Sequence, residues 1–225
     1  MIRARAPRLL LAALVVFLPS GARRFVLTRL LGHDIHPEAT VGRAFLDVDH
    51  LVMGDRARIG NLVAIRGCEE VRLGTGAVIH LLVWVNSVRA SSGYFPGSTR
   101  RPALILGDHA LITMLHFIDA CDLVQLDDYA CIAGYGTIVQ THAVDMEELR
   151  QSSTPVHIGH HALVATRGLL LPGADVPDRA VVAAGAVVGG RLEGHKIFAG
   201  VPAKPVRDVD VEGAFFTREN FSHVW

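Results

Sequence analysis

His142 is the residue whose type and surroundings best suit acid–base chemistry in this chain. An imidazole titrates near neutral pH, so its neutral form can take a proton from an alcohol, which is otherwise a poor nucleophile. Three carboxylates follow within a short polar stretch, namely Asp145, Glu147 and Glu148. Each is near enough along the chain to orient the ring. The sequence therefore predicts a general base at His142, and we take Asp145 as its orienting acid; the alternative is an exposed loop histidine.

A second candidate, His116, lies in the segment LHFIDACD together with Asp119. In the repeat described below this segment stacks over Gly136, one corner away from His142, so the two histidines are not expected to meet within one chain. Across a subunit boundary, His116 or Asp119 could bind an acceptor beside a neighbour's His142. We predict His116 as a further catalytic residue; the alternative is a turn histidine held by local hydrogen bonds.

A third group contains His157, His160 and His161. Metal ligands must converge on one ion, whereas adjacent side chains in a strand or turn point apart. Surface histidines are the favoured interpretation, and no metal is expected.

Composition bounds what the chain can be. It has 225 residues, half of them hydrophobic and a fifth charged, which is enough apolar content for a packed core. Basic and acidic residues balance at 22 each and aromatics are 6%, a composition that argues against a nucleic-acid binder. Three cysteines without a CxxC pair indicate reduced thiols. No apolar run approaches the ~20 residues of a membrane-spanning helix.

The elements that must position these side chains follow from a repeat. Seven segments share an aliphatic residue or Met, three other residues, and then Ala: 35–39, 53–57, 73–77, 106–110, 126–130, 158–162 and 176–180. Six residues after each start comes a β-branched residue: Val41, Ile59, Ile79, Ile112, Ile132, Val164 and Val182. Six further on come Asp47, Ile65, Val85, Ile118, Ile138, Leu170 and Val188. Only Asp47 breaks this aliphatic set. Three hexads to a coil predict short strands and tight turns, stacked so that each face forms a parallel sheet with the aliphatic residues inward.

Two insertions interrupt the repeat, at about 86–104 and 142–157. Both follow the third hexad of a coil, so both are expected to leave the same corner of the prism. Loops that leave a regular scaffold commonly carry function.

The hexads resemble those of the hexapeptide-repeat acyltransferases, and the resemblance extends over nearly the whole chain. The closing segments LLPGA (170–174), VVAAGAVV (181–188) and FAGVPAKPVR (198–207) are similar to the family's last coils and exit motif. The stretch IAGYGTIVQTHAVD (132–145) is similar to the segment with the catalytic histidine, and 18–32 to the lead-in of polysaccharide-pathway and sugar O-acetyltransferases. The resemblance implies an all-β fold, a left-handed parallel β-helix of about seven coils, assembled as a homotrimer.

The resemblance also implies a co-substrate, acetyl-CoA, and a place for it. Lys204 and Arg207 lie in the exit motif, where family members contact the donor. Ala184 and Gly185 are small enough for the pantetheine arm to run along the backbone, although small residues also simply fit tight corners. Arg167 is a further candidate phosphate contact. The segment LVATRG (163–168) departs from the family's usual pattern.

The N-terminus permits three interpretations. Arg3, Arg5 and Arg8 precede the apolar run Leu9–Leu18, and Ser20-Gly21-Ala22 resembles a cleavage site. A secretory signal peptide is one interpretation. We favour a helical segment, 1–31, in peripheral contact with the cytoplasmic face of a membrane, because acyl-CoA is cytosolic. A helix that caps the open end of the solenoid is the third.

These observations divide the chain into a helical lead-in (1–32), a β-helix domain (33–207) and a C-terminal tail (208–225). The tail contains Phe215, Phe216, Phe221 and Trp225, which are expected to form a short cap or a subunit contact. The predicted function is a CoA-dependent O-acyltransferase that acetylates a hydroxyl of a sugar or glycan precursor in the cytoplasm. One alternative is a non-catalytic β-helix scaffold. Another is a metalloenzyme of the γ-carbonic anhydrase type. Its three-histidine ligand set looks incomplete here, because the residue five positions after His116 is Cys121 and not a second histidine.

Overall fold

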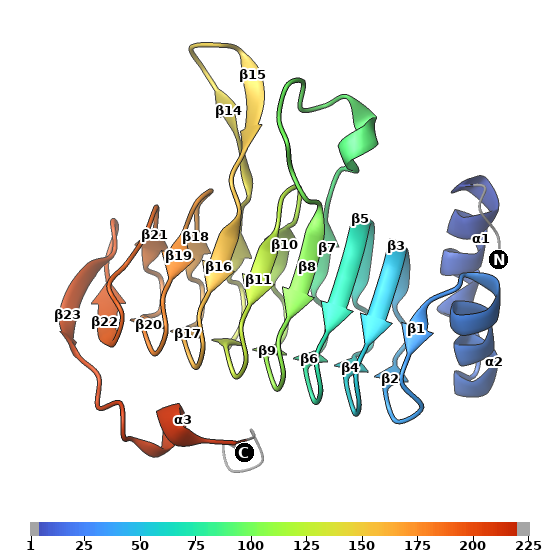
Figure 1. The fold of residues 1–225 in the computed structure, drawn as a ribbon, viewed down its shortest axis with the longest axis horizontal. Coiled ribbons are helices and arrows are strands. Elements are labelled where there is room, and N and C mark those ends of the chain that lie inside the picture. The colour runs from blue at the N-terminus through green and yellow to red at the C-terminus, as the bar shows by residue number, and fades with distance from the viewer. Residues whose placement is uncertain (1–4, 220–225) are drawn as a thin grey trace.

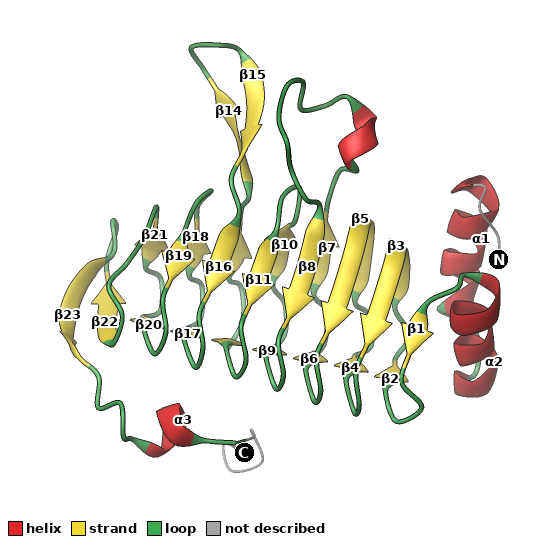
Figure 2. Ribbon diagram, viewed as in Figure 1, coloured by secondary structure: helices red, strands yellow, loops and turns green. Residues whose placement is uncertain are grey.

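The computed structural model describes residues 5–219, so Arg3, Phe221 and Trp225 lie outside the described residues. The chain winds into a stack of coils whose short strands form parallel sheets around one axis (Figure 1). Loops and turns separate most of the strands (Figure 2). The β-helix that the repeat predicts is confirmed.

Two sheets account for the coils. The first contains β1 (Asp34–Ile35), β3 (Phe45–Met53), β5 (Ala64–Leu73), β7 (Trp84–Asn86), β8 (Ala103–Leu106), β10 (Phe117–Asp119), β11 (Val124–Leu126), β13 (Ile138–Val139), β16 (Val156–Ile158), β18 (Leu169–Leu170), β19 (Asp175–Val176) and β21 (Val187–Val188). The second contains β2 (Thr40–Val41), β4 (Arg58–Ile59), β6 (Val78–Ile79), β9 (Leu111–Ile112), β12 (Cys131–Ile132), β17 (Leu163–Val164), β20 (Val181–Val182), β22 (Lys196–Ala199) and β23 (Lys204–Asp208).

The long strand β5 bends the first sheet into two faces. Its start pairs with β7 and its end pairs with β8. From there one face continues through β10, β13, β18 and β21, and the other through β11, β16 and β19. With the second sheet, these faces enclose an interior of aliphatic side chains, such as Ile79, Ile112 and Val164, that are completely buried. Branched residues suit this pleated, buried surface.

One predicted inward position is wrong, and the reason is a single extra residue. Ile138 is 41% exposed, whereas Val139 is buried in the core. Val139 lies seven residues after the inward Ile132, while Ile118 lies six after Ile112. The turn between Ile132 and Val139 contains Gly134 and Gly136, both at positive φ, which glycine adopts without steric cost. The added turn residue moves every later residue of that strand by one position.

Both insertions leave the corner between the two faces of the first sheet, as predicted (Figure 1). The first connects β7 to β8 and contains the 3-10 turn η2 (Ala90–Ser92). The second connects β13 to β16 and forms an antiparallel hairpin of β14 (His142–Asp145) and β15 (Arg150–Ser153). The coil of β10 and β11 lies between them.

Helices cover the N-terminal end of the stack. They are α1 (Arg5–Val15), α2 (Ser20–Phe25) and the π-helical turn η1 (Val26–Leu30). Val15 and Leu27 belong to the same buried core as the coils. The buried guanidinium of Arg23 donates to the carbonyls of Val15, Leu18 and Val41 at 3.2, 2.7 and 2.8 Å, which ties α1 to the first coil. No helix in the described part of the chain is long and apolar enough to cross a bilayer.

The C-terminal end closes differently. β23 pairs antiparallel with β22, which ends the parallel ladder. The tail then turns back beneath the stack through α3 (Ala214–Thr217) (Figure 1). His161 Nε2 donates to the carbonyl of Arg218 at 3.0 Å, and Phe216 is buried, so the tail covers part of the second sheet.

Candidate active site

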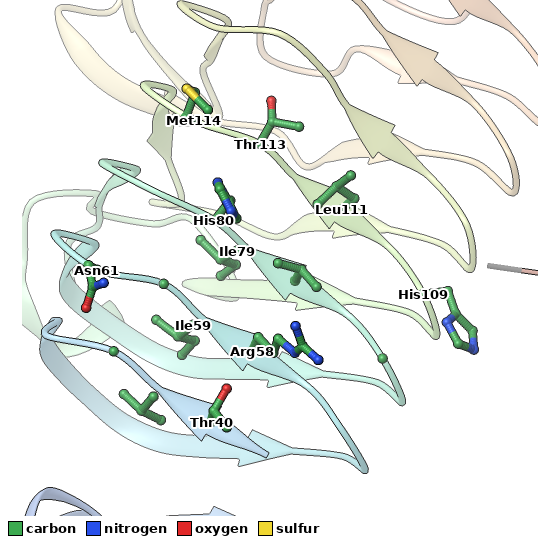
Figure 3. Close-up of a pocket in the computed structure, with 15 residues that line it drawn as sticks. Thr40, Arg58, Ile59, Asn61, Ile79, His80, His109, Leu111, Thr113 and Met114 are labelled. Carbon is green, nitrogen blue, oxygen red and sulfur yellow. The ribbon is translucent and has the colours of Figure 1, made fainter. Parts of the chain in front are cut away.

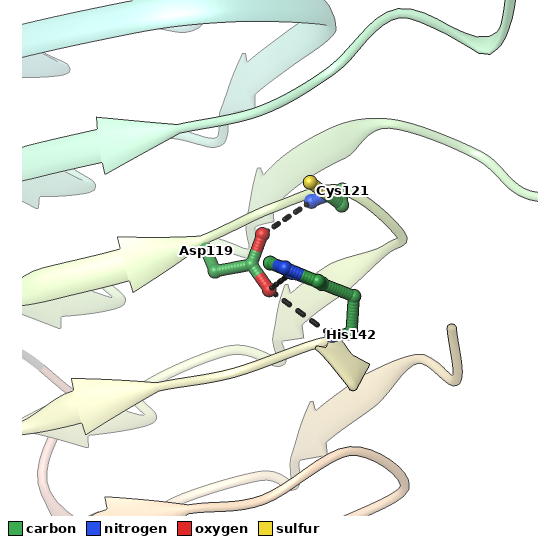
Figure 4. Close-up of side chains that lie close together, drawn as sticks. All are labelled: Asp119, Cys121 and His142. Atoms are coloured by element: carbon green, nitrogen blue, oxygen red, sulfur yellow. Dashed lines mark hydrogen bonds and ion pairs between the residues drawn. The ribbon is translucent and has the colours of Figure 1, made fainter. Parts of the chain in front are cut away.

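The corner with the two insertions brings together His142 and Asp119. Asp119 ends β10, and His142 begins β14 just after β13, the strand that pairs with β10. One carboxylate oxygen of Asp119, Oδ2, accepts the backbone N–H groups of Thr141 and His142 at 2.9 and 3.0 Å. The same oxygen lies 2.5 Å from Nδ1 of the His142 ring (Figure 4). The backbone N–H groups of Thr141 and His142 therefore fix the Asp119 carboxylate of the preceding coil, and that carboxylate orients the His142 ring.

This arrangement shifts the pKa of both groups. Burial alone would raise the pKa of Asp119, but hydrogen bonds from His142, Cys121 and the Thr141 backbone outweigh it and lower that pKa to about 2. The hydrogen bond to Asp119 raises the pKa of His142, against a smaller opposing effect of burial. Asp119 is thus an anion at neutral pH, and it stabilises a proton on its partner.

The hydrogen bond also sets which ring nitrogen is basic. An ionised carboxylate only accepts, so Nδ1 of His142 must carry the hydrogen that Asp119 receives. Nε2 of the neutral ring is then unprotonated and can take a proton from another molecule. The His142 side chain is 37% exposed, so a substrate can reach it.

The first insertion supplies a wall beside this pair. The ring of Phe95 meets the His142 ring edge-on, with centroids 5.9 Å apart. The guanidinium of Arg100 lies 4.2 Å from the Phe95 centroid and donates to the carbonyls of Cys121 and Arg89 at 2.8 and 2.6 Å. The loop is therefore fixed to the coil that carries Asp119, and it holds an apolar ring against one side of the base.

Asp119, Cys121 and His142 lie near enough to one another to be considered as metal ligands, with their donor atoms within 4.8 Å. The hydrogen bonding of Asp119 argues against it. Its Oδ2 already faces two backbone N–H groups, the Thr141 hydroxyl and the His142 ring, while Oδ1 accepts the N–H of Cys121 at 3.0 Å. Burial raises the pKa of the Cys121 thiol to about 12, so in this structure the sulfur is a neutral thiol. The geometry favours a hydrogen-bonded pair.

Two predicted catalytic residues do not have the predicted contacts. Asp145 lies farther along the hairpin, where its Oδ1 accepts the backbone N–H groups of Glu147 and Glu148, each at 3.0 Å. The carboxylate on the His142 ring is that of Asp119 instead. The reason is topological: β10 ends beside β13, whereas β14 carries Asp145 away from the corner.

His116 is completely buried. Its Nδ1 accepts the N–H of Thr137 at 3.1 Å, and its Nε2 lies 2.9 Å from the Thr113 hydroxyl. Burial lowers the pKa of His116 to about 4, so the ring is neutral and locked. This matches the alternative of a turn histidine held by local hydrogen bonds, and a catalytic role for His116 is not supported. His116 lies beside Thr137 and not beside Gly136, because the turn between Ile132 and Val139 contains one extra residue.

The predicted donor-binding residues lie on the C-terminal coils. Arg167 and Gly185 occupy the same corner of successive coils, because the Gly185 N–H donates to the carbonyl of Thr166 at 3.0 Å. Arg167, Ala184 and Gly185 are exposed at this corner. Lys204 and Arg207 are exposed on β23 at the closing end. The structure leaves all five accessible.

The remaining histidines have other partners. The His157 ring bridges two carboxylates, Asp127 at 2.7 Å and Asp175 at 2.9 Å, and so links three coils. His160 and His161 meet edge-on rather than converging on one point. A groove of about 780 Å³ lies on the second sheet, lined by residues such as Arg58, His80 and His109 (Figure 3), away from the pair at the insertion corner.

Sequence reasoning missed Asp119 as the partner of His142, and it missed Phe95 and Arg100. The sequence did contain a signal for Asp119. Ile118 and Val139 are paired inward residues of successive coils, so the residues that follow each of them lie at the same corner. No pattern in the first insertion indicated that Phe95 would face His142.

The fold is similar to that of several solved acyltransferase structures. A variant of AntD, an N-acyltransferase from Bacillus cereus in complex with dTDP and coenzyme A, matches with a TM-score of 0.58 at 14% identity over 70% of this chain and 84% of that chain. The polySia-specific acetyltransferase NeuO matches with a TM-score of 0.56 at 16% identity over 84% and 86%.

A hexapeptide-repeat acetyltransferase from Vibrio cholerae O1 biovar eltor, complexed with acetyl coenzyme A, matches with a TM-score of 0.50 at 16% identity over 92% of this chain and 87% of that chain. No protein-family model matches the chain, and no curated protein sequence does. At these identities the likeness is one of fold. The chain therefore has the β-helix fold of the hexapeptide-repeat acyltransferases.

Proposed function

We propose that this protein is an acyl-CoA-dependent acyltransferase that acetylates a hydroxyl group of a sugar or glycan precursor, with His142 as general base. The observation that carries the proposal is the Asp119–His142 pair, an imidazole with one nitrogen fixed by a partly buried carboxylate and the other free to act. A scaffold protein has no use for such a pair beside two inserted loops. The shared fold with acyltransferases of known activity supports the same conclusion.

The proposed step uses this geometry directly. His142 Nε2 takes the proton of the acceptor hydroxyl as the acceptor oxygen forms a bond to the thioester carbonyl carbon. The carbon–sulfur bond of the thioester then breaks, and the CoA thiolate leaves. The proton held on His142 passes to that sulfur, so the base is regenerated. Asp119 stabilises the imidazolium in between, because its carboxylate stays ionised.

Acetyl-CoA would supply the activated acyl group, and we assign its contacts to the C-terminal coils. Lys204, Arg207 and Arg167 are exposed cations suited to phosphates. Ala184 and Gly185 leave the backbone of their corner open to an extended chain. Because acyl-CoA is cytosolic, the proposed reaction belongs in the cytoplasm.

We also propose that the protein is a homotrimer. The face of β7, β10 and β13 presents Trp84, Phe117 and Ile138 side by side, each between 41% and 57% exposed. Neighbouring exposed apolar side chains of this kind favour a protein–protein interface. Since the interior of the β-helix is filled, substrates must bind outside it, and a groove between subunits would shelter them.

Replacing Phe117 by Asp should dissociate the trimer, because the substitution places a charge between the exposed apolar side chains of Trp84 and Ile138. Light scattering coupled to gel filtration should show the mass fall from three chains to one. Leu149→Asp is the matched control, since Leu149 is 86% exposed at the hairpin tip and should leave the mass unchanged. A wild-type protein that is monomeric at micromolar concentration would refute the assembly.

The experiment that tests the function is release of free CoA thiol from acetyl-CoA over a panel of sugar and glycan acceptors. Amino sugars belong in the panel, because the similarity to AntD makes an amine acceptor the second candidate. Turnover on a hydroxyl acceptor supports the proposal, and turnover on amines alone moves it to N-acylation. A protein that neither binds nor consumes acetyl-CoA is not an acyltransferase of this kind.

A further inference from the structure

The helices that cap the β-helix have an apolar outer face. On α1 and the turn after it, the exposed apolar positions are Ala6, Leu10, Ala13, Leu14 and Phe17, which recur at the spacing of one helix side. Leu10, Leu14 and Phe17 are 73%, 51% and 81% exposed. The opposite side of α1 packs on the coils. The helix therefore buries one apolar side and shows another to solvent.

Phe25, on α2, extends this surface and is 58% exposed. We call the set Ala6, Leu10, Ala13, Leu14, Phe17 and Phe25 the N-terminal apolar face. An ordinary capping helix needs apolar residues only where it covers the core, and polar residues elsewhere. The burial of Ala12 and Val15 explains the cap, but it does not explain this face.

The segment that carries the N-terminal apolar face has charged residues of one sign only. The first 33 residues contain six arginines and no acidic residue, although the whole chain is neutral. Arg5 and Arg29 are exposed on α1 and η1. The remainder of the chain must carry a net negative charge, so the excess positive charge is concentrated in the N-terminal helical segment.

We infer that the N-terminal apolar face binds the surface of an anionic lipid bilayer. Helices that lie in a membrane interface combine exposed Leu and Phe with flanking arginines, which attract acidic headgroups while the apolar side enters the acyl boundary. A second copy of the chain is a poorer occupant. A symmetric contact through this face would bring arginines together, and no carboxylate from these helices could pair with them.

The inference is tested by flotation of the full-length protein with vesicles. Vesicles of phosphatidylcholine with about a third phosphatidylglycerol should carry the protein upward, and pure phosphatidylcholine should carry much less. Raising the salt concentration should weaken the binding, because exposed charges are screened. Replacing Leu14 and Phe17 by Ser should reduce partitioning to the anionic vesicles at least tenfold.

The matched control replaces Met146 and Leu149 by Ser at the hairpin tip, where they are 88% and 86% exposed. This variant should float like the wild type. The inference is overturned if the wild type does not float with anionic vesicles, or if both double variants lose binding equally. It is also overturned if the Leu14/Phe17 variant instead has a lower mass in solution, since the face would then join copies of the chain. Acyl transfer to a soluble acceptor is a separate readout, so failure here leaves the proposed activity untouched.

Discussion

Replacing His142 by Ala should lower acetyl transfer to a hydroxyl acceptor by on the order of 10²–10⁴-fold, the usual contribution of a positioned general base. The loss should fall on the chemical step, because Nε2 takes a proton only as the acceptor attacks. Affinity for acetyl-CoA should stay near the wild-type value, since the donor contacts are assigned to other coils. Steady-state thiol release and calorimetric CoA binding measure the two quantities separately.

His50→Ala is the matched control, because His50 is exposed on β3 and distant along the chain from both insertions. It should be as active as the wild type. If His142→Ala also keeps full activity on hydroxyl acceptors, the general-base assignment is wrong. A small effect confined to amine acceptors would instead indicate that the acceptor is itself a sufficient nucleophile.

Removing the carboxylate of Asp119 should have the second-largest effect. Asp119→Ala leaves the His142 ring without its anchor and without the charge that stabilises the imidazolium, so activity should fall by at least about 10²-fold. Asp145→Ala should be nearly neutral, because Asp145 contacts the hairpin backbone and not the ring. Equal losses in the two variants would contradict the geometry at this corner. A thermal melt of each variant separates loss of activity from loss of folding.

Asp119→Asn isolates the charge. The amide oxygen can still accept the His142 ring hydrogen, but the negative charge that raises the pKa of His142 is gone. The base is active when unprotonated, so the rate rises with pH through that pKa. In the Asn variant this rise should come at lower pH, and the plateau above it should be lower. A pH profile of kcat/KM that keeps the wild-type midpoint would show that Asp119 does not act on the base.

The fold could be predicted from the sequence because the same six-residue pattern recurs along the β-helix domain. Aliphatic residues at six-residue spacing predict a β-helix, and the structure has that fold. The contacts at the corner could not be predicted in the same way. They depend on a single additional residue between Ile132 and Val139, which a hexad count does not detect and which changes the partner of His116.

The two carboxylate candidates show the same limit. Asp145 is near His142 along the chain, and sequence reasoning favours neighbours along the chain. Asp119 is 23 residues away, and it reaches the ring because parallel strands of successive coils end at one corner. In a solenoid, the neighbour one coil away is often the nearer one. Phe95 belongs to a loop whose path no repeat constrains, so only the structure could place it.

The number of strand pairings also gives the distance between His142 and the capped end of the stack. Five strand pairings separate β1, beside the capping helices, from β16, which follows the His142 hairpin. At ~4.8 Å for each pairing, the base stands roughly 24 Å along the stack from the capped end. If the stack stands upright on a bilayer through the N-terminal apolar face, a hydroxyl next to the headgroups is out of reach of His142. A membrane-anchored glycan acceptor of the proposed kind would then have to extend several sugar units outward to meet the base.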